Sequence, residues 1–191
     1  GGFATSGPQF MMDFLTPEGK AAVAQYNPFT DDPTYRCEPV AIRRVWGAPG
    51  TPLAITRQGD DVVISYEWMD AKRIIHMNQD AVPLDAEPSI LGYSIGHFED
   101  DTLVIETGRF TQGVLNQFVT AEGQPMRGLL HSDQLRTVER LSLDQERNRL
   151  VMSMDHYDDA FFSRDFPNYT REYRPSTLDI QPFGCIPEQL K

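Results

Sequence analysis

His131, Ser132 and Asp133 stand in a row and supply the three side-chain types of a nucleophilic triad. In a working triad the serine faces the histidine and the histidine faces the aspartate. Neighbouring residues of a strand point to opposite faces, so His131 and Ser132 diverge, and the chain has no Gly-x-Ser-x-Gly elbow. The sequence therefore favours His131 as a general base or acid oriented by Asp133. In the structural alternative, Ser132 or Asp133 closes a turn and His131 is exposed.

Charged residues recur in segments that otherwise alternate like half-buried strands: Glu67, Arg73, Glu106, Glu139 and Arg140. A charge taken out of water needs a partner or a function. One hypothesis is that Arg73 binds a substrate carboxylate or enolate while Glu67 acts as a base. Tyr66 and Tyr93 could donate a proton in the same pocket. The alternative is that these charges form cross-strand ion pairs that fix the register.

The other histidines, His76, His97 and His156, show neither His-x-His nor His-Glu-x-x-His spacing, so the motifs predict no metal site, and a histidine site assembled by the fold is left as the alternative. His97 directly precedes a predicted hairpin and joins Arg73 and Tyr93 as a candidate substrate-binding residue. The chain has no Gly-x-Gly-x-x-Gly or Walker sequence. No nucleotide, nicotinamide or other cofactor is therefore expected.

The elements that must position these residues are mostly strands. Alternating apolar residues and short turns predict three hairpins, over residues 60–77, 94–107 and 135–157, followed by two short strands in 160–175. The segment between Phe110 and Leu130 is Gly-rich and predicts a long irregular loop. Thr16 is a good N-cap and Pro17 suits the first helical position, so residues 17–26 predict one short helix. The pattern indicates an all-β, antiparallel barrel or strongly curled sheet that could enclose a small ligand.

Composition limits the partners. The chain has 191 residues and a formal net charge of −11, which argues against nucleic acid and anionic lipid surfaces. No apolar run approaches the roughly 18 residues that a membrane helix needs, so no membrane insertion is expected. We expect one domain over residues 1–191, with an arm (1–15), a helix and cysteine loop (16–38) and a barrel (39–191). A homo-oligomer remains open.

Cys37 and Cys185 lie near the two ends of the chain, and neither belongs to a Cys-x-x-Cys pair. One disulfide that ties the ends together would give this arrangement. Two unrelated buried thiols are the alternative.

Four segments resemble a family of uncharacterised bacterial exported proteins: "LTPEGKAAVAQYNPFTDDPTYRC", "YEWMDAKRIIHM", "SILGYSIGHFEDDTLVIET" and "HSDQLRTVER". The resemblance implies a periplasmic or secreted protein, which fits a disulfide between Cys37 and Cys185. It carries over no catalytic residues. The family commonly has Trp before Glu99 and Gly after it, where this chain has Phe98 and Asp100. The hairpin "GHFEDDTLVIET" is also similar to hairpins of lipocalin-like barrels, an analogy of fold alone.

Two functions stay open at this point. The first is a cofactor-free enzyme that transfers protons on a small hydrophobic molecule, aromatic ones included, as an isomerase, lyase, cyclase or hydratase does. Its catalytic residues would be His131, Asp133, Glu67 and Tyr66. The second is a periplasmic carrier of a small apolar ligand. A cavity with a titratable group and a nearby donor favours the enzyme, and a cavity lined by aliphatic and aromatic side chains favours the carrier.

Overall fold

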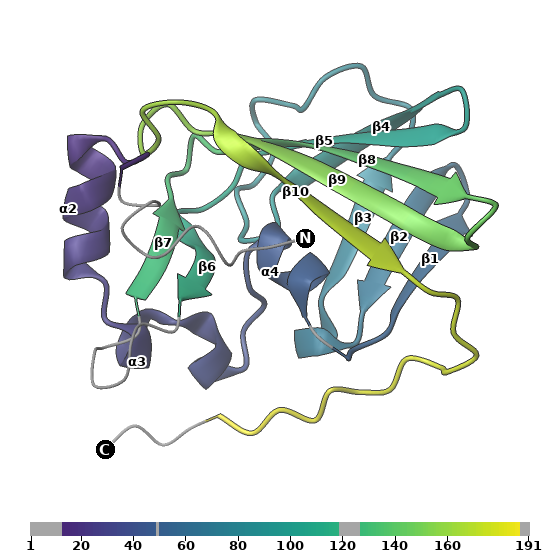
Figure 1. Cartoon of the computed structure of the whole chain (residues 1–191), viewed down its shortest axis with the longest axis horizontal. Coiled ribbons are helices and arrows are strands. Elements are labelled where there is room, and N and C mark those ends of the chain that lie inside the picture. The colour runs from purple at the N-terminus through teal and green to yellow at the C-terminus, as the bar shows by residue number, and fades with distance from the viewer. Residues whose placement is uncertain (1–12, 49, 119–126, 188–191) are drawn as a thin grey trace.

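An eight-stranded sheet curls into a half-barrel in the computed structural model, which describes residues 13–48, 50–118 and 127–187 (Figure 1). Neighbouring strands pair antiparallel except β3 and β4, which are parallel. The predicted all-β curled sheet is confirmed. In spatial order the strands are β1 (Leu53–Gln58), β2 (Asp61–Tyr66), β3 (Lys72–His76), β4 (Tyr93–Glu99), β5 (Thr102–Gly108), β8 (Arg136–Asp144), β9 (Arg149–Tyr157) and β10 (Phe166–Tyr173).

Alternating side chains decide which face of the sheet is inside. In β2, Ile64 and Tyr66 are buried as the alternation predicts, and in β8 Thr137 and Glu139 are buried while Arg140 is exposed. Successive side chains of a strand point to opposite faces, so each strand presents one set of residues to the concave side. This concave side holds the core and the polar groups described below.

A second sheet closes one end of the half-barrel and corrects the loop predicted between Phe110 and Leu130. It consists of β6 (Gly113–Phe118) and β7 (Arg127–His131), which pair antiparallel. Residues 119–126 of the predicted loop lie outside the described residues. The strands form because their apolar residues are buried against helices: β7 packs on α2 (Pro17–Gln25) and β6 on α4 (Ile42–Gly47). The Gly-rich composition hid this pairing.

Two strand predictions also differ from the structure. The sequence predicted two short strands in residues 160–175, but one strand, β10, carries a bulge between Phe166 and Tyr169. The sheet also begins earlier than predicted, with β1. Four of the six residues of β1 are exposed, so its apolar alternation is weak. Position at an edge of the sheet, which the sequence does not show, explains its polar composition.

The helices are short. α2 begins as predicted, because the Thr16 hydroxyl accepts a hydrogen bond from the Gly19 amide at 3.1 Å. Beyond the one predicted helix the chain forms α3 (Pro28–Asp31), α4, and the 3₁₀ turns η1 (Pro33–Arg36) and η2 (Trp68–Asp70). Residues 1–12 of the predicted arm lie outside the described residues. Across the described ranges, the helices lack the length and apolar character needed to cross a membrane.

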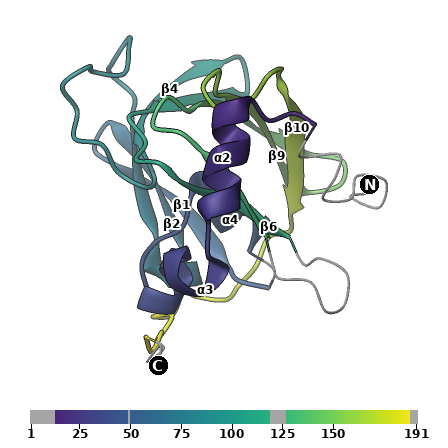
Figure 2. The same cartoon turned by 90° about the vertical axis from the view of Figure 1, so that its left-hand side faces the viewer.

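α4 lies inside the curl of the sheet, and α2 stands outside it against the β6–β7 hairpin (Figures 1 and 2). Ile42, Val45 and Trp46 of α4 are buried in the core. The Trp46 ring meets Tyr66 edge-on at 5.3 Å between centroids and lies 5.5 Å from the Tyr173 ring. α4 therefore occupies part of the concave side of the sheet.

The C-terminal segment, residues 174–187, has no regular structure but is fixed at several points. Its backbone amides at Gln181 and Phe183 donate to the carboxylates of Glu67 and Asp70, each at 3.0 Å. Cys185 forms a disulfide with Cys37, 148 residues away in the chain. The structure therefore shows the end-to-end disulfide rather than two separate thiols.

Candidate functional site

A row of buried polar side chains crosses the concave face of the half-barrel. Ser94 on β4 lies opposite Thr107 on β5, and Thr107 lies opposite Thr137 on β8. Thr137 in turn lies opposite His156 on β9. All four side chains are at most 3% exposed. Because opposite residues of paired strands share a face, these four residues form one band, which we call the polar band.

Arg73 and Glu139 form an ion pair beside the polar band. Arg73 Nη1 donates to Glu139 Oε1 at 3.0 Å and Nη2 donates to Oε2 at 2.7 Å. Arg73 Nη2 also donates to the hydroxyls of Ser94 and Thr107, at 2.9 and 3.1 Å. The Trp46 indole donates to the same carboxylate. Such a buried pair is held by its additional hydrogen bonds, which offset the cost of removing both charges from water.

The Arg73 guanidinium is charged, but nearly all of its hydrogen-bonding positions are occupied by protein groups and not open to a substrate. Burial lowers the pKa of Arg73, but the Glu139 carboxylate outweighs it, so the pKa is raised overall and the guanidinium stays charged. Burial raises the pKa of Tyr66, whose hydroxyl lies 3.4 Å from Arg73 Nη1. Of the three guanidinium nitrogens of Arg73, only Nε lacks a hydrogen-bond partner among the described residues. The structure thus brings Arg73 and Tyr66 together, around Glu139 rather than around open space.

His131 lies at the end of β7 and is fully buried. Its Nδ1 lies 2.9 Å from the carbonyl oxygen of Ser132, and a carbonyl only accepts, so Nδ1 carries the proton and Nε2 bears the lone pair. Burial lowers the pKa of His131, which keeps the ring neutral. Its Nε2 has no hydrogen-bond partner in the described part of the chain. This is the geometry of an acceptor with a fixed tautomer.

Asp133 does not orient His131. β7 ends at His131 and the chain turns immediately afterwards, which leaves Asp133 exposed. Asp158 takes the position near the strand end instead. Its carboxylate accepts from the Ser132 hydroxyl at 2.6 Å and from the Ser132 amide at 2.7 Å. The Ser132 hydroxyl is therefore directed at a carboxylate and not at the His131 ring.

His156, at the end of the polar band, is the second buried histidine. Burial lowers its pKa well below the usual value, and the nearby charge of Arg43 acts in the same direction. Neither of its ring nitrogens has a hydrogen-bond partner among the described residues, and the Thr137 hydroxyl opposite it has none there either. Together with His131 Nε2, these are buried polar atoms that form no hydrogen bond with the described part of the protein.

The remaining predicted site residues lie away from the concave face. Tyr93 stacks on His76 with 4.7 Å between centroids and exchanges hydrogen bonds with Gln79. The His97 ring is exposed and lies 3.2 Å from the Glu99 carboxylate. Glu67 accepts from the C-terminal segment. Strand alternation explains Tyr93 and His97, because Ser94 between them faces inward.

The open end of the concave face carries two neighbouring clefts with volumes of about 440 and 420 Å³, which we call the mouth clefts. In β8, Leu143 lies two alternate positions beyond Glu139 and so faces the same side. Leu143 lies opposite Leu150, and Leu150 lies opposite Tyr173. Ile55 of β1 lines both clefts. Further apolar side chains line the clefts, among them Leu53, Val62, Met77, Phe98 and Leu178, and polar side chains such as Thr56, Asp60 and Asn78 line part of the second cleft.

Several of these mouth residues are exposed, two on the concave side of strands and one, Leu178, in the C-terminal segment. Leu143 is 58% exposed, Phe98 62% and Leu178 74%. Exposed apolar side chains scattered singly are ordinary, but a group of them around one opening marks a binding surface. The clefts have the volume and the lining of small-molecule sites.

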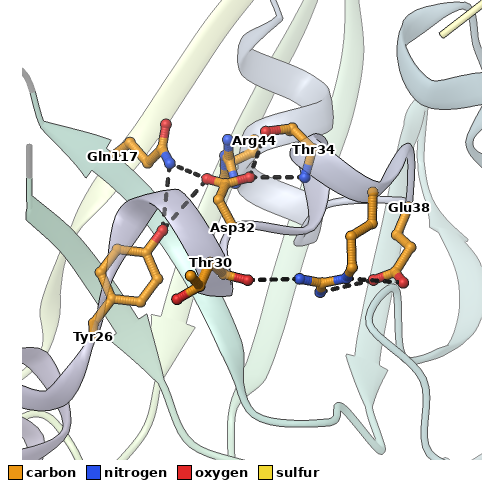
Figure 3. Close-up of polar contacts among 8 residues, drawn as sticks. Tyr26, Thr30, Asp32, Thr34, Glu38, Arg44 and Gln117 are labelled. Carbon is orange, nitrogen blue, oxygen red and sulfur yellow. Dashed lines mark hydrogen bonds and ion pairs between the residues drawn. The ribbon is translucent and has the colours of Figure 1, made fainter. Parts of the chain in front are cut away.

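A third cleft, of about 570 Å³, lies between α2 and the β6–β7 hairpin, outside the concave face. One wall is Tyr26, whose hydroxyl lies 3.4 Å from the buried Asp32 carboxylate (Figure 3). Asp32 also accepts from Arg44 at 3.0 Å and from Gln117. Burial, followed by the Asp32 charge, raises the pKa of Tyr26. Asp32 thereby ties the N-terminal helices to α4 and β6, a structural task that occupies its oxygens.

The roles of Asp32, Asp158 and the polar band could not be predicted from the sequence. Asp32 and Asp158 each precede a turn, and an aspartate at that position predicts only a local cap. The polar band depends on which strands become neighbours. Among the described residues no three His, Cys, Asp or Glu side chains come together in a way that could hold a metal ion.

Comparison with known proteins finds no matching family model, no matching curated sequence and no matching solved structure.

Proposed function

We propose that this protein is a carrier that binds a small apolar molecule at the mouth of its half-barrel. The observation that supports the proposal most directly is the pair of mouth clefts, which share Ile55; the 440 Å³ cleft is lined mainly by apolar side chains, and half of the residues lining the other are apolar. The titratable candidates His131, Glu67 and Tyr66 do not line these clefts. The described residues that line the 440 Å³ cleft include no carboxylate and no histidine, so this cleft retains a ligand by burial rather than by proton transfer.

The same proposal includes a periplasmic or secreted location. The Cys37–Cys185 disulfide supports it, because disulfides persist in oxidising compartments. The resemblance to exported proteins supports it independently. A carrier in such a compartment would move molecules that dissolve poorly in water.

Binding can be tested with N-phenyl-1-naphthylamine, a neutral apolar probe that fluoresces when it leaves water. The parent protein should bind it, and Leu143→Asp should weaken the binding at least about tenfold, because burying an unpaired carboxylate beside the probe is costly. Ile74→Asp is the matched control. Ile74 is 46% exposed and occupies the outer side of β3, so this variant should bind like the parent. Equal loss in both variants, or no binding by the parent, would contradict the proposal.

A second candidate function, proton transfer, is favoured by one observation. His131 has its proton fixed on Nδ1 by the Ser132 carbonyl, while Nε2 has no partner among the described residues. A neutral imidazole with a free Nε2 is the form in which histidine acts as a general base. In this case the protein would be a cofactor-free isomerase or lyase, and its substrate would reach His131 inside the fold.

The two functions can be separated by turnover. If His131 is a base, His131→Gln should lower kcat by roughly two to four orders of magnitude, whereas Ser132→Ala should change it little. If the protein is a carrier, no turnover of aromatic or terpenoid compounds should occur, and His131→Gln should bind the naphthylamine probe like the parent. Circular dichroism of both variants checks that the buried substitutions leave the fold intact.

A further inference from the structure

We propose that the ligand of the mouth clefts is an amphipathic carboxylate, with its apolar chain along Ile55 and Leu143 and its carboxylate on Arg174. This inference rests on the proposed binding function and adds the chemical class of the ligand. It follows from the charges at the rim of the clefts and from the way in which the rim is held.

Arg174 is the single charged residue among those that line the 440 Å³ cleft. It follows Tyr173, the last residue of β10, and its side chain is exposed. Within the described residues it makes no ion pair and no hydrogen bond. A guanidinium offers a planar fork of donors that matches the two oxygens of a carboxylate. An arginine at the rim of an apolar slot therefore selects a ligand with an anionic end.

Two other exposed arginines of the sheet, Arg140 and Arg147, are paired with carboxylates, which distinguishes Arg174 from them. Arg147 lies 3.4 Å from Asp144 and also pairs with Glu172, and Arg140 lies 3.3 Å from Asp155. Their carboxylates come from neighbouring strands or turns. The protein carries a net charge of −11, so an unpaired arginine is not explained by a shortage of acidic residues.

The second cleft adds little charge of its own. It is lined by Arg57 and Asp60, whose charges cancel, and Arg57 Nε donates to the Gly59 carbonyl within the same turn at 3.1 Å. The two clefts together therefore carry one net positive charge, located at Arg174. The apolar chain of the ligand would lie toward Ile55 and the second cleft, away from that charge.

The rim at Arg174 is anchored on both sides. β10 ends at Tyr173, whose hydroxyl donates to the Trp46 carbonyl at 2.5 Å. The segment beyond it is held by the Glu67 and Asp70 carboxylates and by the disulfide at Cys185. Ser176, which also lines the cleft, places a hydroxyl near the same rim. Groups held in place before binding lose less conformational freedom when a ligand arrives.

The test compares three ligands that share a ten-carbon chain: decanoate, decanol and decylamine, each below the concentration at which it forms micelles. Calorimetric titration of the parent should give the tightest binding for decanoate. Arg174→Gln should weaken decanoate binding about tenfold or more and change decanol binding less than about twofold. Arg140→Gln, at an exposed arginine outside the clefts, is the matched control and should bind all three ligands like the parent. From octanoate to decanoate the affinity should rise about fourfold per added methylene.

Each unfavourable result has its own meaning. If decanol binds as tightly as decanoate to the parent, the ligand class is wrong but the carrier function stands. Equal weakening of all three ligands in Arg174→Gln overturns the role of Arg174 as the carboxylate partner. If none of the three ligands binds and the naphthylamine probe also fails to bind, the carrier function itself is wrong.

Discussion

Arg73 on β3 and Glu139 on β8 meet in a two-pronged ion pair inside the half-barrel, although 66 residues separate them in the chain. β4 and β5 lie between their strands in the sheet. The Arg73 side chain therefore reaches past both, and it hydrogen-bonds a hydroxyl from each on the way.

Removal of one partner of this pair should be far more harmful than removal of both. Arg73→Met should lower the free energy of unfolding by about 3–5 kcal/mol, because it leaves the Glu139 carboxylate buried without a cation. The double variant Arg73→Met with Glu139→Leu should recover most of this loss. Urea denaturation of the parent, of Arg73→Met, of Glu139→Leu and of the double variant measures both effects. A double variant as unstable as the sum of the single ones would show that the two residues are not coupled.

Acid should destabilise the protein through its two buried histidines. The pKa of His131 and of His156 is lowered in the folded state, so below pH 6.5 the unfolded chain binds more protons than the folded one. Stability is therefore complete above pH 6.5 and falls as the pH decreases toward the folded-state pKa. Each histidine can contribute up to about 1.4 kcal/mol per pH unit in that window. Arg43 and Asp158 are the charged groups that act on them, with opposite signs.

Thermal unfolding at a series of pH values tests this expectation. His156→Phe removes one of the two titrating rings and should flatten the pH dependence between about pH 5 and 6.5. His97→Gln, which replaces an exposed histidine, is the control for the substitution of a histidine outside the core. An identical slope in the parent and in His156→Phe would exclude His156 as a source of the acid sensitivity.

Loss of the disulfide should lower stability without changing the sheet. The bond joins residues 148 positions apart, and a closed loop of that length stabilises the fold by about 5 kcal/mol through chain entropy. We expect Cys37→Ala with Cys185→Ala to reduce the free energy of unfolding by roughly this amount, and strand content by circular dichroism to stay the same. An unchanged unfolding midpoint would contradict the expectation.

Replacement of one residue in the β4–β5 turn by glycine should stabilise the protein. Asp100 has a φ of 50°, a backbone conformation that costs most residues about 1–2 kcal/mol and glycine much less. Asp100→Gly should therefore raise the free energy of unfolding by about 0.5–1 kcal/mol. Asp101 lies next to it and does not have a positive φ. Asp101→Gly should accordingly lower stability, because it increases the conformational entropy of the unfolded chain and relieves no backbone strain in the folded one.

Local signals in the sequence predicted the elements that depend on local physics. The alternation in β2, the Thr16 cap and the hairpin turn at Asp100 and Asp101 all follow from a few adjacent residues. The sequence did not predict β1 or the β6–β7 hairpin, because the stability of these strands comes from the strands and helices on which they pack. The same limit applies to the site. Arg73 could be recognised as a charge in a buried strand, but its pairing with Glu139 depends on the order of the strands.

The parallel pairing between β3 and β4 is the shortest in the sheet, and we expect it to divide the sheet into two cooperative unfolding units, or foldons. Only two residue pairs join these strands, Ile75 with Ser94 and His76 with Ile95. Every other pair of neighbouring strands in the sheet shares more residue pairs. We expect amide hydrogens of β1–β3 to exchange together, in openings that leave β4–β10 folded. A ligand between Ile55 and Leu143 would touch both foldons and slow those openings. The rate at which β1–β3 separate from β4–β10 would then depend on whether a ligand is bound between them.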